Sequence, residues 1–202
     1  MNIKNTLAAA LIATCTVGSA LAADAIPYPA TTPGSENLDT YTFKATEDGV
    51  ITAYFMGSGA SYNEKLGLLI NGVDSGILGL QNHSTSVGTA LDFCTVQKDD
   101  VLTFYIVVQE SRDTWYSNKS LNADKSNHVY STAYTGGAAG VPAGTYVAFE
   151  DLPASSSDFN YFDETFVFTN VSTTSAVPEP GNVALLLAGL GLMGAAARRR
   201  RA

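Results

Sequence analysis

The middle of the chain reads Val101-Leu102-Thr103-Phe104-Tyr105-Ile106-Val107-Val108-Gln109, a run of apolar, β-branched and aromatic residues without proline or glycine. Residues of this kind favour the extended conformation because their side chains pack well on a pleated surface. The apolar residues 104–108 do not alternate with polar ones, which is typical of a strand covered on both faces. The stretch therefore predicts a strand inside a layered β structure.

Similar runs occur on both sides of this stretch, separated by turn signals. The candidate strands, by residue number, are 40–44, 50–55, 66–70, 86–93, 101–109, 128–134, 145–149 and 165–171. Asn71-Gly72 and Asp74-Ser75-Gly76 resemble hairpin turns. No long segment of helical periodicity precedes residue 177. Many short strands at this spacing predict an all-β fold, a single jelly-roll-like β-sandwich over residues 39–171.

The N-terminus has the features of an export signal. Lys4 precedes an uncharged apolar run over residues 7–21, and Ala20-Leu21-Ala22 is a pattern that signal peptidase cleaves. We therefore expect residues 1–22 to be a signal peptide with a helical apolar part, and the protein to be exported across the inner membrane. The proline-rich residues 23–38 indicate an extended lead-in, and residues 172–176, mostly serine and threonine, indicate a linker.

The C-terminus carries three features in a fixed order. Val177-Pro178-Glu179-Pro180 is expected to be extended, because proline fixes φ and lacks an amide donor. The apolar residues 183–197 would form a helix of about 22 Å, a marginal span for a hydrocarbon core of about 30 Å. Arg198-Arg199-Arg200-Arg201 then forms a positive cluster that stays cytoplasmic. This order indicates a transient membrane span that holds the body of the protein outside.

The same order resembles the PEP-CTERM sorting signal, in which a Val-Pro-Glu-Pro box precedes a transmembrane helix and an arginine cluster. Residues 177–180 match the box residue for residue, and the helix and arginine run match in kind. The resemblance implies cleavage near the box by an exosortase, an intramembrane cysteine protease, in bacteria that make exopolysaccharide. It places the protein at the cell envelope, outer surface or extracellular matrix of a Gram-negative bacterium. The alternative is an ordinary C-terminal anchor.

The charge of the exported body excludes one class of partner. Residues 24–176 contain eighteen Asp and Glu against six Lys and Arg, a net charge of −12. Such a surface repels phosphate backbones, so we expect no nucleic acid partner. If Cys15 is removed with the signal peptide, Cys94 is the only cysteine left, and we expect it to be a small buried hydrophobe. Divalent cations and cationic or neutral polymers are better candidate partners.

One stretch of the body concentrates acidic residues. It reads Phe149-Glu150-Asp151-Leu152-Pro153-Ala154-Ser155-Ser156-Ser157-Asp158-Phe159-Asn160-Tyr161-Phe162-Asp163-Glu164. Carboxylates this close together repel one another unless a cation neutralises them, and Ca²⁺ takes oxygen ligands. The candidate calcium ligands are Glu150, Asp151, Asp158, Asn160 and Asp163. The alternative is a solvated acidic loop.

This stretch also resembles the C-terminal signature of a β-rich domain of unknown function found in secreted bacterial proteins. There, a Phe-Glu-Asp strand end is followed by an Asp-x-Asp-Tyr-Asn-Asp loop and an apolar strand. Residues 149–151 match the strand end, and residues 158–163 match the loop with Asn160 for Asp and Phe162 for Asn. The resemblance, which extends from about residue 41 to residue 171, favours the calcium site. Phe162 removes one possible ligand.

Enzymatic interpretations have less support. Glu150 and Asp163 could serve as the two carboxyls of a glycoside hydrolase, but a loop this acidic is more often structural. His83 and His128 have no cysteine or second histidine at zinc-ligand spacing. No Gly-x-Ser-x-Gly motif occurs. We therefore expect that the protein is not an enzyme.

A polar stretch with two aromatic residues leaves a binding role open. Trp115 and Tyr116 could form a platform on which a sugar ring stacks, or the same pair could cover the core. The leading interpretation is an exported, non-catalytic surface or matrix protein associated with exopolysaccharide or biofilm. The alternative is a carbohydrate-binding, lectin-like module, and a glycoside hydrolase is the third hypothesis.

Overall fold

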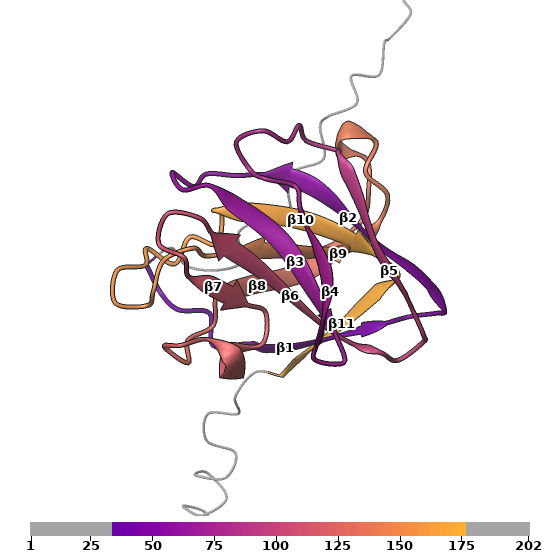
Figure 1. Cartoon of the computed structure of the whole chain (residues 1–202), viewed down its shortest axis with the longest axis horizontal. Coiled ribbons are helices and arrows are strands. Elements are labelled where there is room, and N and C mark those ends of the chain that lie inside the picture. The colour runs from indigo at the N-terminus through magenta and orange to yellow at the C-terminus, as the bar shows by residue number, and fades with distance from the viewer. Residues whose placement is uncertain (1–33, 177–202) are drawn as a thin grey trace, which may run out of the picture.

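The structure, a computed structural model, describes residues 34–176 as two antiparallel sheets packed face to face (Figure 1). The strands of the six-stranded sheet are β1 (Thr40–Ala45), β3 (Glu64–Ile70), β4 (Val73–Gly79), β6 (Val101–Val108), β7 (Thr114–Tyr116) and β11 (Val171–Ala176). Those of the five-stranded sheet are β2 (Gly49–Gly57), β5 (Ala90–Val96), β8 (Val129–Tyr134), β9 (Gly144–Phe149) and β10 (Glu164–Thr169). Two short 3₁₀ helices complete the fold, η1 (Lys119–Leu121) and η2 (Ala138–Gly140). The predicted all-β sandwich is confirmed.

The order of strands places β6 inside the larger sheet. That sheet runs β11-β1-β6-β3-β4 with β7 also paired to β6, and the smaller sheet runs β5-β2-β10-β9-β8. Phe104 and Ile106 of β6 are fully buried towards the core. On the other face of β6, the ring of Tyr105 lies over Gly67, where a Cβ atom would overlap it. Both faces of β6 are therefore covered, as its continuous apolar run predicts.

Phenylalanine rings pack within each sheet, and one stacked pair joins the two sheets. Phe104 of β6 stacks on Phe168 of β10, with ring centroids 3.8 Å apart and planes 19° from parallel. Phe166 meets Phe55 edge to face at 6.0 Å, and Phe43 meets Phe104 in the same way at 5.2 Å. Such pairs contribute about 0.5–1.5 kcal/mol each beyond the burial of their surface. The core is therefore an interlocked aromatic layer with leucine, isoleucine and valine around it.

The outer face of the five-stranded sheet is covered as well. A second apolar cluster there includes Tyr146 of β9, Val167 of β10 and Tyr161, which comes from the loop between these strands. Tyr161 is fully buried. Its hydroxyl donates to the carbonyl of Asn127 over 3.1 Å and accepts from the amide of Asn37 over 2.8 Å. This side chain anchors the acidic loop to the sheet.

One of the two predicted turns is wrong. Asn71-Gly72 does form the β3–β4 turn, with positive φ angles of 51° and 81°. Residues 74–76, predicted as a turn, instead lie inside β4, where Asp74 is opposite Leu69. The pairing of β3 with β4 is irregular between Gly67 and Leu69. The turn-forming residues therefore make a bulged edge strand. The strand predicted over residues 86–93 also begins late, at Ala90.

The boundaries of the domain are wider than predicted. Residues 172–176, expected to be a linker, belong to β11, which pairs with β1 from Thr40–Ala176 to Ala45–Val171. At the other end, the amide of Gly34 donates to the carbonyl of Asp158 over 2.7 Å. Residues 34–38 of the expected lead-in thus pack on the fold. Composition alone indicated a linker here. The pairing of β11 with β1 instead gives the backbone N–H and C=O groups of these serines and threonines hydrogen-bond partners in the sheet.

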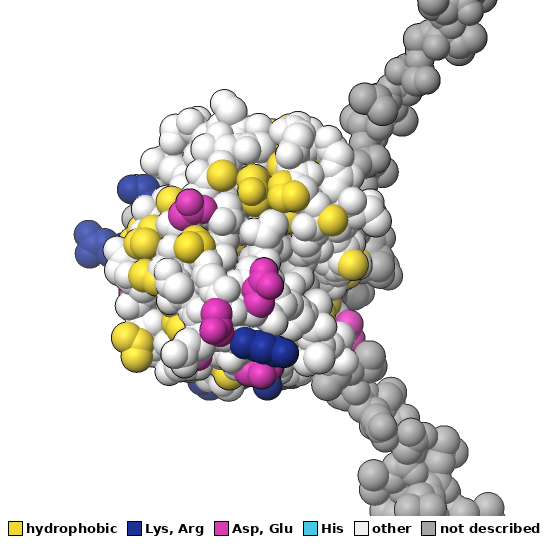
Figure 2. All heavy atoms as spheres, turned by 90° about the vertical axis from the view of Figure 1, so that its right-hand side faces the viewer, with side chains coloured by type: hydrophobic (Ala, Val, Ile, Leu, Met, Phe, Trp, Pro, Cys, Tyr) yellow, Lys and Arg dark blue, Asp and Glu magenta, His cyan; other side chains and the backbone are white. Residues whose placement is uncertain are grey.

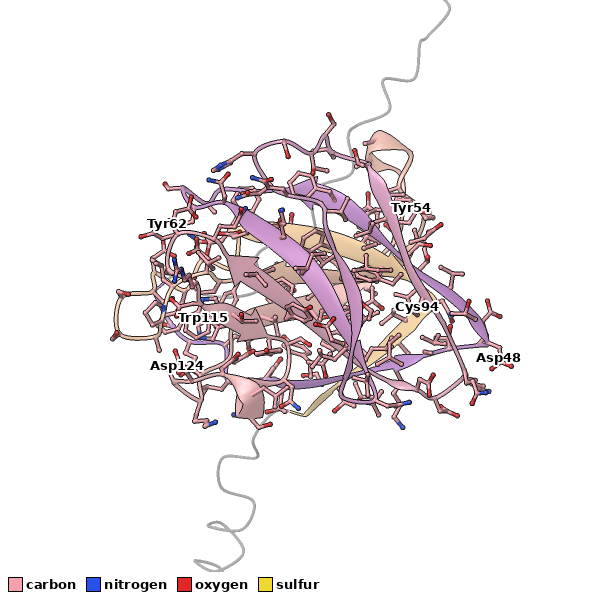
Figure 3. All side chains as sticks on the ribbon, in the orientation of Figure 1. Asp48, Tyr54, Tyr62, Cys94, Trp115 and Asp124 are labelled. Atoms are coloured by element: carbon pink, nitrogen blue, oxygen red, sulfur yellow. The ribbon has the colours of Figure 1, made fainter. Side chains whose placement is uncertain are left out.

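Cys94 differs from expectation because it is only partly buried. It lies in β5, an edge strand of the smaller sheet, whose core residues are Phe93 and Val96. Figure 3 labels Cys94 on this edge.

Within residues 34–176, no helix is both long and apolar enough to cross a membrane. The expected signal peptide, the membrane helix of residues 183–197, the Val-Pro-Glu-Pro box and the arginine cluster lie outside the residues that the structure describes.

We expect Phe104→Ala to lower the free energy of unfolding by about 3–5 kcal/mol, because it removes the ring that stacks between the sheets and leaves a cavity. Urea denaturation of the purified protein measures this change. Val73→Ala is the matched control, because Val73 is 71% exposed and its truncation should change stability by less than about 0.5 kcal/mol. Equal effects of the two substitutions would contradict the described core.

Candidate metal centre

The acidic loop between β9 and β10 is closed by the pairing of its two ends. Glu164, the first residue of β10, lies opposite Phe149, the last residue of β9. The amide of Asp163 donates to the carbonyl of Phe149 over 3.1 Å. Glu150 and Asp151 directly follow one strand, and Asp163 directly precedes the other. The antiparallel register therefore brings these three side chains together.

Glu150, Asp151 and Asp163 form a buried acidic triad. Each offers a carboxylate oxygen that lies within 4.8 Å of the other two, and the three residues are only 1%, 5% and 7% exposed, respectively. The amide of Asp151 donates to Oδ2 of Asp163 over 2.9 Å, whereas Oε2 of Glu150 has no hydrogen-bond partner. This buried acidic triad could hold a metal ion.

Asp158 and Asn160 lie at the open side of the triad. Together with Asp151, Asp163 and residues 59–62 of the β2–β3 connection, they line a pocket of about 370 Å³. The side-chain amide of Asn160 donates to Asp158 over 2.9 Å, and Oδ1 of Asn160 accepts from the amide of Phe162 over 2.7 Å. The structure thus brings the five predicted ligands to one region, three in the triad and two at the pocket.

The triad lacks a basic partner. Burial first, and then the neighbouring Glu150 and Asp151 carboxylates, raise the pKa of Asp163 to about 8. Burial also raises the pKa of Glu150 to about 7, against a hydrogen bond with Ser157 that lowers it. Among residues 34–176, the only ion pair joins His128 to Asp124. A proton or a metal ion therefore has to supply the positive charge that these carboxyls need.

Two buried glutamates near the triad were not predicted. Glu64 and Glu164 are both 0% exposed, and none of their four carboxyl oxygens has a hydrogen-bond partner. A glutamate at the start of a strand is normally solvated, so the residue type does not predict burial. The alternation of side chains along a strand does predict it. Glu64 stands two positions before Leu66, and Glu164 two positions before Phe166, so each lies on the inward-facing side of its strand.

The aromatic pair of Trp115 and His128 contacts the backbone carbonyls of two triad residues, Asp151 and Glu150. The ring of Trp115 stacks on that of His128, with centroids 3.9 Å apart and planes 7° from parallel. The indole N–H of Trp115 donates to the carbonyl of Asp151 over 2.6 Å. Nδ1 of His128 lies 3.0 Å from the carbonyl oxygen of Glu150. These contacts fix where the two side chains that follow β9 can point.

The position of Trp115 corrects the hypothesis of a sugar-stacking platform. Trp115 is 3% exposed, and Tyr116 is partly buried, with its ring 5.5 Å from that of Tyr105. Figure 3 shows Trp115 at the same end of the sandwich as Tyr62 and Asp124. The pair therefore covers the core, which was the alternative interpretation, because the indole N–H finds its acceptor inside the fold.

His128 also connects the triad to the rest of the loop. Its Nε2 atom lies 3.0 Å from Oδ2 of Asp124, and the same oxygen accepts from the amide of Ala154 over 2.9 Å. Burial would raise the pKa of Asp124, but hydrogen bonds from Ala154, Ser126 and His128 outweigh it and hold the pKa below its usual value. Asp124 is therefore a charged acceptor that ties the start of the loop to the aromatic pair.

The buried acidic residues Glu150, Asp151 and Asp163 lie at the loop end of the molecule. In Figure 1 the acidic loop lies at the left-hand end of the sandwich. Figure 2 shows the right-hand face, on which acidic and basic side chains lie near one another with apolar ones between them. The face seen in Figure 2 carries no continuous acidic patch.

Comparison with known proteins assigns the tail but not the body. Residues 176–201 match the PEP-CTERM protein-sorting motif, which includes the Val-Pro-Glu-Pro box and the four arginines. No curated protein and no solved structure matches the chain. The motif implies an exported protein that an exosortase sorts to the cell surface. The predicted resemblance is thus confirmed for the tail, while the sandwich remains unassigned.

In the presence of EDTA, we expect the free energy of unfolding to fall as the pH rises from about 5 to about 8. In the unfolded chain these carboxyls lose their protons near pH 4, but folding raises the pKa of Glu150 to about 7 and of Asp163 to about 8. The folded state therefore binds more protons in this range, and stability is lost as they leave. Urea denaturation at several pH values measures the slope, and a flat or rising profile would contradict the burial of these groups.

Proposed function

We propose that this protein is a calcium-stabilised, non-catalytic β-sandwich that an exosortase processes and that serves as a structural component of the cell surface or of an exopolysaccharide matrix. The observation that carries the proposal is the buried triad of Glu150, Asp151 and Asp163, which has no basic partner in the described chain. A bound divalent cation would convert the repulsion between these carboxylates into attraction.

Several features of the site favour calcium among the divalent ions. The triad offers only oxygen ligands, and Asp158 and Asn160 add further oxygens at the adjoining pocket. Calcium takes six to eight oxygen ligands in flexible geometry, including water. Zinc prefers nitrogen and sulfur, but both ring nitrogens of the nearby His128 already face oxygen acceptors of Glu150 and Asp124.

The same geometry argues against the other functions considered. The lectin-like alternative relied on an exposed Trp115, and that side chain is buried. A glycoside hydrolase needs two carboxyls that flank a sugar bond, whereas Glu150 and Asp163 are both buried within one cluster. We therefore propose a structural role and no catalytic activity.

The sorting motif supports the cell-surface location in this proposal. A single-domain body of residues 34–176 is followed at once by the match over residues 176–201. A body with a strongly negative net charge fits a matrix of polysaccharide and divalent cations better than one of nucleic acid. Exopolysaccharide is the partner that we propose, and the matrix or biofilm is the location.

We expect Ca²⁺ to raise the melting temperature of the mature protein and EDTA to lower it. At one hundred times the dissociation constant, an ion that binds only the folded state stabilises by about 2.7 kcal/mol. Differential scanning calorimetry with and without EDTA measures the shift. Asp163→Asn should abolish most of it, whereas Asp99→Asn, at an exposed position, should leave it intact. A melting temperature that does not respond to EDTA would refute the calcium site.

We expect the mature protein to lack the arginine cluster. Intact-mass measurement of the protein isolated from its own cells should give a C-terminus near residues 177–180. Replacing Pro178 and Pro180 with alanine should leave the full tail in place, because it removes the two prolines of the Pro-Glu-Pro box that the sorting motif contains. Pro142→Ala, at an exposed position of the body, is the control. A mature wild-type chain that keeps Arg198 to Arg201 would exclude processing.

A further inference from the structure

The pocket beside the triad has two triad residues in its wall. Asp151 and Asp163 line this space of about 370 Å³ together with residues 59–62 of the β2–β3 connection, and both belong to the triad. An ion held by the triad would therefore have one side towards the pocket. Calcium takes six to eight oxygen ligands. One oxygen from each triad residue, and one each from Asp158 and Asn160 at the pocket, leave positions for oxygens of a second molecule.

A carboxyl without a full set of partners lies behind the pocket. Glu150 is 1% exposed, and one of its carboxylate oxygens lies within 4.8 Å of an oxygen of Asp151 and of Asp163. The Oε2 atom of Glu150 has no hydrogen-bond partner. A buried carboxylate oxygen without a donor is unfavourable, and a cation on the triad removes this cost. The pocket therefore opens onto a position that favours a cation.

The wall opposite the acidic loop is attached at two points. The amide of Gly59 donates to the carbonyl of Phe162 over 2.8 Å, and a Cβ atom at Gly59 would lie 2.6 Å from the Phe162 ring. The side-chain amide of Asn82, from the β4–β5 connection, donates to the carbonyl of Tyr62 over 2.8 Å. The walls of the pocket are therefore fixed before a ligand arrives, which lowers the entropy cost of binding.

The lining combines an aromatic ring with oxygen acceptors. Tyr62 is 37% exposed and lies at the same end of the sandwich as Asp124 (Figure 3). Ser61 and Asp158 are exposed as well. Within residues 34–176, no lysine, arginine or histidine lines this pocket. Because ionised carboxylates only accept hydrogen bonds, the lining suits a ligand that presents hydroxyl donors next to an apolar surface, as a sugar does.

Charge favours a neutral sugar over an acidic one. Glu150, Asp151, Asp158 and Asp163 carry a formal charge of −4 when ionised, and one divalent ion reduces it to −2 (−4 + 2). A ligand with its own carboxylate would add to this excess of negative charge. A sugar hydroxyl adds none, because its lone pairs coordinate the ion while its proton is donated to a neighbouring carboxylate.

We propose that the pocket binds a neutral sugar of the exopolysaccharide through two adjacent hydroxyls, which complete the coordination of the calcium ion on the triad. The carboxylates that line the pocket accept the protons of these hydroxyls, and the ring of Tyr62 packs against the apolar face of the sugar. The proposal rests on the proposed calcium function of the triad and adds the class of ligand and its place. It does not involve Trp115, which is buried and does not line the pocket.

A glycan array tests the class of ligand. The purified mature protein is applied in CaCl₂ or in EDTA to an array that carries neutral glycans with adjacent hydroxyls and polymers of uronic acids. The temperature is kept well below the melting temperature of the calcium-free protein, so that loss of binding does not report unfolding. We expect binding to neutral glycans in CaCl₂, little binding to the uronic acid polymers, and no binding in EDTA.

Variants of Tyr62 test the place. Calorimetric titration with the neutral glycan that binds best on the array should show about tenfold weaker affinity for Tyr62→Ala, the effect expected for the loss of one aromatic contact. Tyr62→Phe keeps the ring and should keep most of the affinity. Leu78→Ala is a control at a residue that is 50% exposed and does not line the pocket. All three variants should keep the rise in melting temperature that calcium causes.

The outcomes separate this inference from the function on which it rests. A melting temperature that rises with calcium, together with no glycan binding or binding to uronic acid polymers only, would overturn the inference and leave the calcium-stabilised sandwich standing. Glycan binding that persists in EDTA, or that Tyr62→Ala leaves unchanged, would place the sugar elsewhere and overturn it as well. A melting temperature that does not respond to calcium would refute both proposals. If Tyr62→Ala fails to fold, the array and Tyr62→Phe still decide.

Discussion

Side chains alternate between the two faces along β3 and β10, so the row of core residues on the inward face of each strand continues to a buried glutamate at the start of that strand. The inward face of β10 holds Phe168, Phe166 and then Glu164, and β3 presents Leu68, Leu66 and then Glu64 in the same way. Register that buries the phenylalanines also buries the glutamates, since every second residue of a strand shares a face. The strands therefore cannot bury these apolar rows without also burying the two acidic side chains that precede them.

A calcium ion bound to the triad of Glu150, Asp151 and Asp163 would stabilise this fold, as a disulfide stabilises other exported domains. Cys94 is the only cysteine in the described chain, so a covalent bridge between the sheets is not an option. Ions held by extracellular modules dissociate at about 10⁻⁴–10⁻³ M. With an affinity of that order, the proposed site would bind calcium once the body reaches the outside of the cell. The stability of the fold would then depend on the calcium concentration of the surroundings and not on their redox state.

The fold was more predictable than the interior of the site. Strands such as β6 and β10 follow from runs of β-branched and aromatic residues, and Glu150, Asp151 and Asp163 follow from a dense acidic stretch. Burial of Trp115 could not be read from its polar neighbours, because it depends on His128 and on the Asp151 carbonyl, which are distant in the sequence. Glu64 was missed because the predicted strand began at residue 66, so the alternation that buries the side chain was not followed back to its position. Residues 74–76 and 172–176 misled because turn and linker composition also suits bulged and edge strands.

The pairing of Thr40 with Ala176 has a mechanical consequence. The described chain enters and leaves the larger sheet at the same point, on two adjacent strands that run in opposite directions. A load pulling those two ends apart would act on one hydrogen-bonded pair at a time, beginning at Thr40 and Ala176 and moving towards Ala45 and Val171. Such peeling meets less resistance than shearing a whole strand past its neighbour. With the sorting motif beginning at residue 176, tension on the tail reaches this weak seam directly, whereas the acidic end of the sandwich is held by contacts that the seam does not include.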